Sequence, residues 1–313
     1  MPNLTQIALA APWFTDAQAT QAMSCDRPQI AKHKWTRLKM LLSVLALGCV
    51  AMPPDSQARS NVKFLINYGA AIPEWVGRYD VAVLDSEVAA STVAKRHQRS
   101  IILGYLSLGE VHSGRDYMGE VKAEGLLLRP NPSWPDARFI DLRDRRWHAR
   151  VIDMLVPGIL SKGFDGIFLD TLDDAEFLEQ QDPVRFAGMV DAAAELLRGI
   201  RRRFPGIPLM VNRGYAVLPG AAGAFDMLLG ESVVTTYDAA SGAYRVLPET
   251  DYRWQVTQMQ EAQRRDPKLR LFSLDYWNPN DPRGIARIYA QQRTNGFIPY
   301  VGTPDLTRVV SEP

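Results

Sequence analysis

Eight short apolar runs, separated by longer amphipathic stretches, repeat along the chain from Asn61 onward. Most are apolar on both faces, as strands of a parallel sheet must be when helices cover its two sides. Strand and helix alternation carried to eight strands predicts a single (β/α)₈ TIM barrel, with a doubly wound open sheet as the alternative. We expect the strands near Lys63–Tyr68, Val81–Asp85, Ile101–Leu108, Gly166–Asp170, Leu209–Asn212, Met227–Glu231, Leu271–Asp275 and Phe297–Val301.

The segments between the later strands have the apolar spacing of helices. A run of arginines at 201–203 ends the second of them, and we interpret it as a solvated helix end that complements the helix dipole. The connection from Glu110 to Trp147 is long and rich in proline, which is typical of a functional loop. The predicted helices cover Trp147–Lys162, Pro183–Phe204, Pro248–Arg265 and Pro282–Thr294.

The N-terminal part of the chain has the pattern of an export signal. A basic cluster at 32–39 precedes a 13-residue apolar run, Met40–Met52, and small residues at Ser56 and Ala58 follow, which is the order of a secretory signal. We assign 1–31 to a segment that is disordered or upstream of the true start, 32–58 to the signal peptide and 59–313 to the barrel. The apolar run is too short for a comfortable membrane span. A periplasmic or secreted protein is expected, with a lipoprotein modified at Cys49 as the variant.

Charge and cysteine content narrow the function. The net charge of +1 gives no global sign of nucleic acid or of an anionic membrane surface. Cys25 and Cys49 both precede the barrel, so the mature domain is expected to use no disulfide or thiol chemistry. No nucleotide-binding or serine-hydrolase motif is present, and no cofactor is expected. Protein partners leave no readable mark.

Acidic side chains gather where the expected strands end, although the whole chain is nearly neutral. One sign of charge attracts the other, so we expect a cationic substrate or, with weaker support, a metal. His112 is the only histidine near these ends and no metal-ligand spacing occurs, which leaves an all-carboxylate calcium site as the metal alternative. The acids are Asp85, Glu87, Glu110, Asp170, Asp173, Asp174, Glu231 and Asp275.

Two of these acids end apolar runs of the same kind. Asp170 closes the run GFDGIFLD and Glu231 closes FDMLLGE. Two acids at the carboxyl ends of barrel strands are suited to cleave a glycosidic bond. Tyrosine and tryptophan beside them suit a sugar, although each aromatic taken singly fits packing better. Asp165 and Asp226 stand at the starts of the same strands, on the opposite face, and are interpreted as structural.

Five segments carry a family pattern: Val81–Glu87, Ile102–Glu110, Gly163–Asp173, Met210–Gly214 and Leu274–Tyr276. With them the chain resembles the endo-α-1,4-polygalactosaminidases, the barrels of the glycoside hydrolase family 114 type, and the hydrolase domains of the bacterial Pel-polysaccharide type. The resemblance runs from about residue 61 to residue 308. GYLSLGE and GFDGIFLDTLD are specific in combination and weak alone.

The resemblance implies hydrolysis of α-1,4-linked galactosamine polymers, with Asp170 as the nucleophile and Glu231 as the general acid/base. Galactosamine is cationic when it is not acetylated, which agrees with the acidic strand ends. Asp173 either contacts the substrate or caps the following helix. No metal is implied. The candidate substrate contacts are Asp85, Tyr105, Glu110, Asn212, Asp275 and Tyr276.

Two other functions stay open. The first is an α-galactosidase-like enzyme acting on a neutral sugar, for which so many acids would have no purpose. The second is a non-catalytic carbohydrate-binding barrel that handles exopolysaccharide in a biofilm matrix, because a fold does not guarantee an activity.

Overall fold

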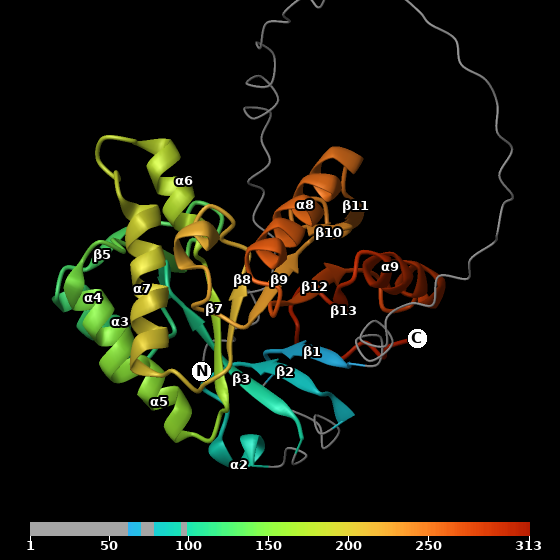
Figure 1. Ribbon diagram of the computed structural model, residues 1–313, viewed down its shortest axis with the longest axis horizontal. Coiled ribbons are helices and arrows are strands. Elements are labelled where there is room, and N and C mark those ends of the chain that lie inside the picture. The colour runs from blue at the N-terminus through green and yellow to red at the C-terminus, as the bar shows by residue number, and fades with distance from the viewer. Residues whose placement is uncertain (1–61, 70–77, 95–98) are drawn as a thin grey trace, which may run out of the picture.

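The computed structural model describes residues 62–69, 78–94 and 99–313 (Figure 1). The signal peptide expected at 32–58, the segment 1–31 and Cys49 lie outside these residues. Eight strands pair in parallel in the order β1-β2-β3-β7-β8-β9-β12-β13. They are β1 (Phe64–Asn67), β2 (Val81–Leu84), β3 (Ile101–Ser107), β7 (Gly166–Asp170), β8 (Leu209–Asn212), β9 (Met227–Glu231), β12 (Arg270–Tyr276) and β13 (Ile298–Gly302).

The sheet curls until its two edges meet. β13 lies beside β1, and a backbone N–H of Tyr68 donates to the carbonyl of Leu306 just past β13 at 2.8 Å. The strands therefore form a nearly closed barrel, which confirms the predicted (β/α)₈ fold. Every strand position lies within about two residues of the predicted one, because runs that are apolar on both faces have no other stable place than between helices.

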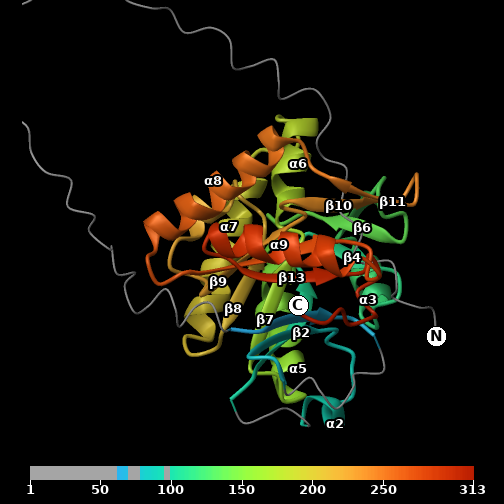
Figure 2. The same ribbon diagram turned by 90° about the vertical axis from the view of Figure 1, so that its right-hand side faces the viewer.

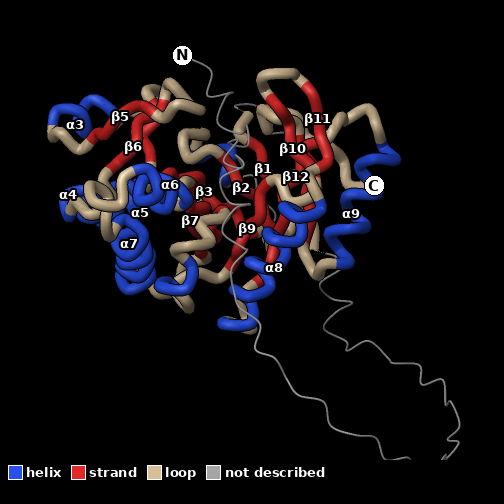
Figure 3. The backbone as a smooth tube through the Cα atoms, turned by 90° about the horizontal axis from the view of Figure 1, so that it is seen from above, coloured by secondary structure: helices blue, strands red, loops and turns tan. Residues whose placement is uncertain are grey.

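Helices cover the outside of this barrel. Figure 3 shows helices to the left of, below and to the right of the strands, and Figure 2 shows α9 (Pro282–Thr294) lying across β13. The segment predicted at 147–162 is one helical stretch from Arg145 to Ser161, with a π-helical turn at Val151–Leu155. The helices are α2 (Ala90–Val93), α4 (Arg145–Arg150), α5 (Val156–Ser161), α6 (Asp173–Gln181), α7 (Met189–Arg203), α8 (Glu249–Arg265) and α9 (Pro282–Thr294), with a 3₁₀ turn at Leu218–Ala221.

The helix predicted at 183–204 begins later than expected. The chain first forms α6, and α7 starts at Met189 after Gly188, whose φ of 84° is left-handed. Glycine adopts this conformation without a steric penalty, so it marks the break between the two helices. No helix within the described ranges is long and apolar enough to cross a membrane.

Two insertions extend the barrel at its carboxyl end. The connection predicted as a long loop contains β4 (Glu110–His112), α3 (Met118–Ala123), β5 (Leu127–Pro130) and β6 (Ala137–Ile140), whose strands form a small sheet in the order β4-β6-β5. An antiparallel hairpin, β10 (Thr235–Asp238) and β11 (Ala243–Val246), follows β9. Figure 3 places the insertions at two sides of the barrel.

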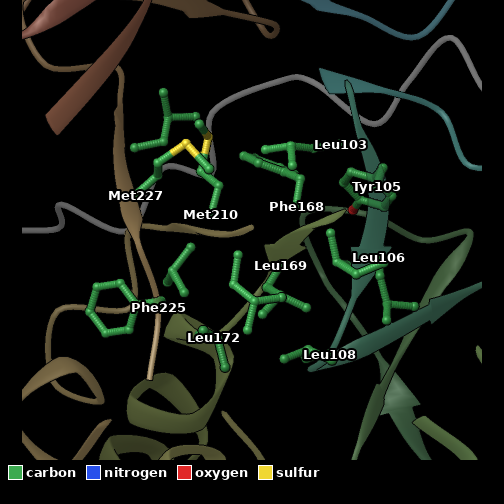
Figure 4. Close-up of a cluster of buried hydrophobic side chains, with 14 of the residues drawn as sticks. Leu103, Tyr105, Leu106, Leu108, Phe168, Leu169, Leu172, Met210, Phe225 and Met227 are labelled. Atoms are coloured by element: carbon green, nitrogen blue, oxygen red, sulfur yellow. The ribbon is translucent and has the colours of Figure 1, made fainter. Parts of the chain in front are cut away.

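Large side chains fill the barrel interior below the strand ends. The rings of Phe64 and Phe272 lie 4.8 Å apart, and those of Tyr105 and Phe168 lie 6.0 Å apart. Figure 4 shows Phe168 next to Tyr105, with Met210 and Met227 on the neighbouring strands. The interior is thus a packed core, and polar chemistry is confined to its upper layer.

Acids at the strand starts have a structural task. The carboxylate of Asp165 accepts the backbone N–H of Ile102 at 2.8 Å, and that of Asp226 accepts the N–H of Leu209 at 2.8 Å. Each carboxylate therefore satisfies a backbone amide at the start of the strand next to its own. This geometry agrees with the structural interpretation of Asp165 and Asp226.

Candidate active site

Polar side chains from neighbouring strands meet in one row at the carboxyl end of the barrel. In both β7 and β9 the first four residues are buried and the last, Asp170 or Glu231, is partly open to solvent. Side chains alternate along a strand, so these residues point inward above Phe168 and Leu229. The row consists of Tyr105 on β3, Asp170 on β7, Asn212 on β8, Glu231 on β9 and Tyr276 on β12.

Asn212 joins the two acids. Its Nδ2 donates to Asp170 Oδ1 at 2.9 Å and to Glu231 Oε2 at 2.7 Å. These two distances laid end to end set an upper limit of 5.6 Å on the separation of the two carboxylate oxygens. The strand order puts β8 between β7 and β9, so the asparagine bridges acids that come from different strands.

A tyrosine holds the outer oxygen of each acid. The hydroxyl of Tyr105 donates to Asp170 Oδ2 at 2.8 Å, and that of Tyr276 donates to Glu231 Oε1 at 2.6 Å. Each carboxylate therefore has both oxygens engaged by a donor from a neighbouring strand. Groups fixed in this way keep one orientation, which a reaction between two acids and a substrate requires.

Burial changes the protonation of this row. Burial raises the pKa of Glu231 to about 7, and the charge of Asp170 adds to the increase, while the hydrogen bonds from Tyr276 and Asn212 oppose it. Burial also raises the pKa of Asp170, against the hydrogen bonds from Asn212 and Tyr105. Near neutral pH the pair is thus poised to hold a proton on Glu231.

Residues with left-handed backbone conformation follow three members of the row. The φ angles are 63° at Thr171, 50° at Arg213 and 53° at Ser232, each directly after a strand end. Such angles are uncommon in residues other than glycine and gather at functional sites. No sequence pattern predicted these angles, because Thr, Arg and Ser do not favour this region.

Thr171 ties the loop after β7 to the loop after β3. Its Oγ1 accepts the backbone N–H of Gly109 at 2.8 Å and lies 2.8 Å from Ser107 Oγ. Ser107 in turn donates to the carbonyl of Glu110 at 2.8 Å. This network fixes the backbone on both sides of Asp170.

A second pair of acids lies beside the row. Glu110 and Asp174 are both buried, and Asn131 Nδ2 donates to Glu110 Oε1 at 2.7 Å. Burial raises the pKa of Glu110 to about 7, and burial and the neighbouring Glu110 charge raise the pKa of Asp174 well above its usual value. Glu110, a predicted substrate contact, thus lies next to the site with one oxygen bound to Asn131.

Asp85, another predicted contact, is paired with a cation. Arg115 lies 3.1 Å from both Asp85 Oδ1 and Glu87 Oε1, and its guanidinium stands 5.4 Å over the ring of Tyr105. Tyr68, at the end of β1, packs edge-on against Tyr105 at 5.3 Å. Arg115 therefore offsets two of the acids that the sequence placed at the strand ends, a pairing that no local pattern indicates.

Asp275 has a different position from the expected one. It precedes Tyr276 on β12, and its carboxylate accepts the backbone N–H groups of Val234 and Thr235 at 2.7 and 2.8 Å and a proton of the Gln292 amide. The side chain is fully buried, and it fixes the segment after β9 against α9. Asp173, at the start of α6, has a half-exposed carboxylate 3.8 Å from Arg213 and does not cap the helix with its side chain.

Within the described ranges, no group of three or more His, Cys, Asp or Glu side chains is placed to hold a metal ion.

Comparison with known proteins bears on the fold and the family of the chain. A model of glycoside-hydrolase family GH114 matches residues 49–312. The chain belongs to this family. The glycoside hydrolase domain of PelA from Pseudomonas aeruginosa is 27% identical, with a TM-score of 0.71 over 80% of this chain and 97% of that one. The barrel is therefore that of a glycoside hydrolase, and the resemblance seen in the sequence is confirmed.

One more distant protein shares the fold, and another is similar in sequence. Ega3 from Aspergillus fumigatus, solved in complex with galactosamine, is 14% identical with a TM-score of 0.58, and the match covers 80% of this chain and 95% of that one. An uncharacterized protein of Thermotoga maritima is 24% identical over 219 residues. That match covers 65% of this chain and 65% of the relative's own length.

Proposed function

We propose that the protein hydrolyses α-1,4-linked galactosamine-containing polysaccharide, with Asp170 as the nucleophile and Glu231 as the general acid/base. The observation that carries the proposal is the bridge from Asn212 to both acids, at 2.9 and 2.7 Å. The family match and the neighbour PelA support glycoside hydrolysis, because the solved part of PelA is its glycoside hydrolase domain. The neighbour Ega3 supports the class of substrate, because it was solved in complex with galactosamine.

The separation of the acids favours a retaining mechanism. Retaining glycosidases hold their carboxyl groups about 5–5.5 Å apart, whereas inverting enzymes leave about 6.5–9.5 Å for a water molecule. The limit of 5.6 Å between the two oxygens that share Asn212 supports the first class. We therefore expect a covalent glycosyl intermediate on Asp170.

The two acids have different tasks in this mechanism. The Glu231 proton passes to the glycosidic oxygen as the bond from this oxygen to the anomeric carbon breaks, and an Asp170 oxygen bonds to that carbon. Glu231 then takes a proton from water, whose oxygen attacks the same carbon and frees Asp170. The raised pKa of Glu231, about 7, suits a group that gives and takes a proton near neutral pH.

The charge around the row fits an amino sugar. Asp170 and the partly exposed Asp173 supply negative charge at the site, while Asp85 and Glu87 are offset by Arg115. An ammonium group on the substrate is attracted to the acids that stay unpaired. A neutral galactoside has no positive charge for these acids to attract.

The test is release of soluble oligosaccharides from partially deacetylated α-1,4-galactosamine polymer, detected by mass spectrometry. Wild-type protein should release oligomers, and Asp170→Asn and Glu231→Gln should release none while they remain folded. Absence of oligomers from folded wild type would overturn the proposal and direct the same assay to neutral α-galactosides. Equal release by wild type and both variants would remove the assigned roles.

A further inference from the structure

Arg213 carries a buried cation that has almost no partner. Its side chain is 13% exposed, yet among the described residues its guanidinium donates no hydrogen bond, and Nε is buried without one. The nearest acid is Asp173, at 3.8 Å, which is beyond hydrogen-bond distance. Burying a donor such as this Nε–H without an acceptor costs free energy.

A second buried arginine of the site, Arg115, is paired with two acids. Arg115 is about equally buried, with 6% exposure, and it binds both oxygens of Asp85 and one oxygen of Glu87. Its charge is therefore used within the fold. Arg213 has only the ion pair with Asp173 at 3.8 Å, so its donors are available to an acceptor from outside the chain.

The backbone makes a strained turn to place Arg213. The φ angles of Arg213 and Gly214 are 50° and 62°, and Gly214 presses so closely on Leu172 that a Cβ there would lie 2.7 Å from it. Because Leu172 belongs to the loop after Asp170, the turn holds the start of the β8 loop against the loop after the nucleophile. A non-glycine residue in this conformation costs free energy, which indicates a positional requirement.

The surroundings of Arg213 restrict what it binds. Arg213 directly follows Asn212 at the end of β8, and its guanidinium lies 3.8 Å from Asp173, so it lies at the same end of the barrel as the two acids. Arginine only donates hydrogen bonds. It repels an ammonium group and binds a neutral oxygen acceptor, and the acceptor that differs between units of this polymer is the carbonyl of an acetamido group.

We propose that Arg213 binds the acetamido carbonyl of an N-acetylated sugar unit next to the scissile bond. The inference rests on the proposed function and adds that the enzyme reads the acetylation pattern of its substrate. An acetylated unit is accepted at Arg213, while free amines are attracted to the unpaired acids elsewhere in the site. The preferred substrate is then a polymer with mixed acetylation.

The test compares Arg213→Met and Arg213→Lys with wild type on two oligosaccharide sets, one fully deacetylated and one acetylated at single known positions. Arg245→Met is the matched control, because Arg245 is an exposed cation of β11 outside the row. Mass spectrometry identifies the units on both sides of each cut. Melting curves select the variants that fold, and Arg213→Lys keeps the charge and most of the volume.

Wild type should cut beside acetylated units preferentially. Arg213→Met should lose about 10- to 100-fold in kcat/KM on those substrates, the range for one or two hydrogen bonds to a charged donor, and little on the deacetylated set. Arg213→Lys should lose part of the preference, and the control none. An unchanged cutting pattern would overturn the proposal, and so would equal losses on both sets, which would indicate binding to a hydroxyl common to all units. If wild type cuts neither set, the proposed function itself fails.

Discussion

Replacing Glu231 with glutamine should stabilise the protein above neutral pH. The pKa of Glu231 is raised from 4.5 to about 7 in the folded state, so folding favours the protonated acid. This contribution to stability is fully present below the unfolded pKa and is lost as pH rises through the folded pKa. Glutamine carries no charge at any of these pH values, so the variant does not undergo this loss.

The size of the effect follows from the two pKa values. The interval between 4.5 and about 7 corresponds to about 3 kcal/mol at roughly 1.4 kcal/mol per pH unit. This is an upper limit, since Glu231 keeps part of its surface in contact with solvent. The stability of Glu231→Gln relative to wild type should therefore rise by up to about 3 kcal/mol between about pH 5 and about pH 8.

Urea unfolding followed by tryptophan fluorescence measures this difference at several pH values in that interval. Comparing variant with wild type at each pH cancels the titration of groups that both share. Glu249→Gln, an exposed acid in the first turn of α8, serves as the matched control and should track wild type. A stability difference for Glu231→Gln that does not change with pH would refute the reasoning that burial protonates this acid.

Three further changes have defined outcomes. Tyr276→Phe removes the hydroxyl that lowers the pKa of Glu231, so the alkaline limb of the kcat/KM profile should move to higher pH; an unmoved limb would contradict this. Arg115→Met leaves Asp85 buried and unpaired and should cost about 3–5 kcal/mol in urea unfolding, whereas a loss below about 1 kcal/mol would show that the pair is dispensable. We also propose that the segment before the barrel directs export: N-terminal sequencing of exported protein should begin just after Ala58, and a protein retained with its full N-terminus would refute it.

Much of the fold was predictable because the eight strands are apolar on both faces. The site was predictable in part, because the carboxyl ends of barrel strands converge whatever the loops do. The insertions β4–β6 and β10–β11 were missed, since short antiparallel strands owe their pairing to partners distant in sequence. Their residues carry no strong periodicity of their own.

The direction of the Asp275 side chain follows from the alternation of side chains along a strand. Asp275 and Tyr276 are consecutive on β12, so they cannot both point into the barrel. Tyr276 points inward to Glu231, and Asp275 points outward to Gln292. The role of Arg115 is different, because its pairing with Asp85 spans 30 positions and depends on the fold of the insertion.

The central claim is that Asp170 and Glu231 act together as nucleophile and acid/base on an α-linked amino-sugar polymer. The most direct test is NMR of the reducing end formed in the first moments of hydrolysis, before mutarotation. The bridge through Asn212 predicts the α-anomer, with the configuration of the substrate retained. A β-anomer as first product would show direct attack by water and would contradict the account.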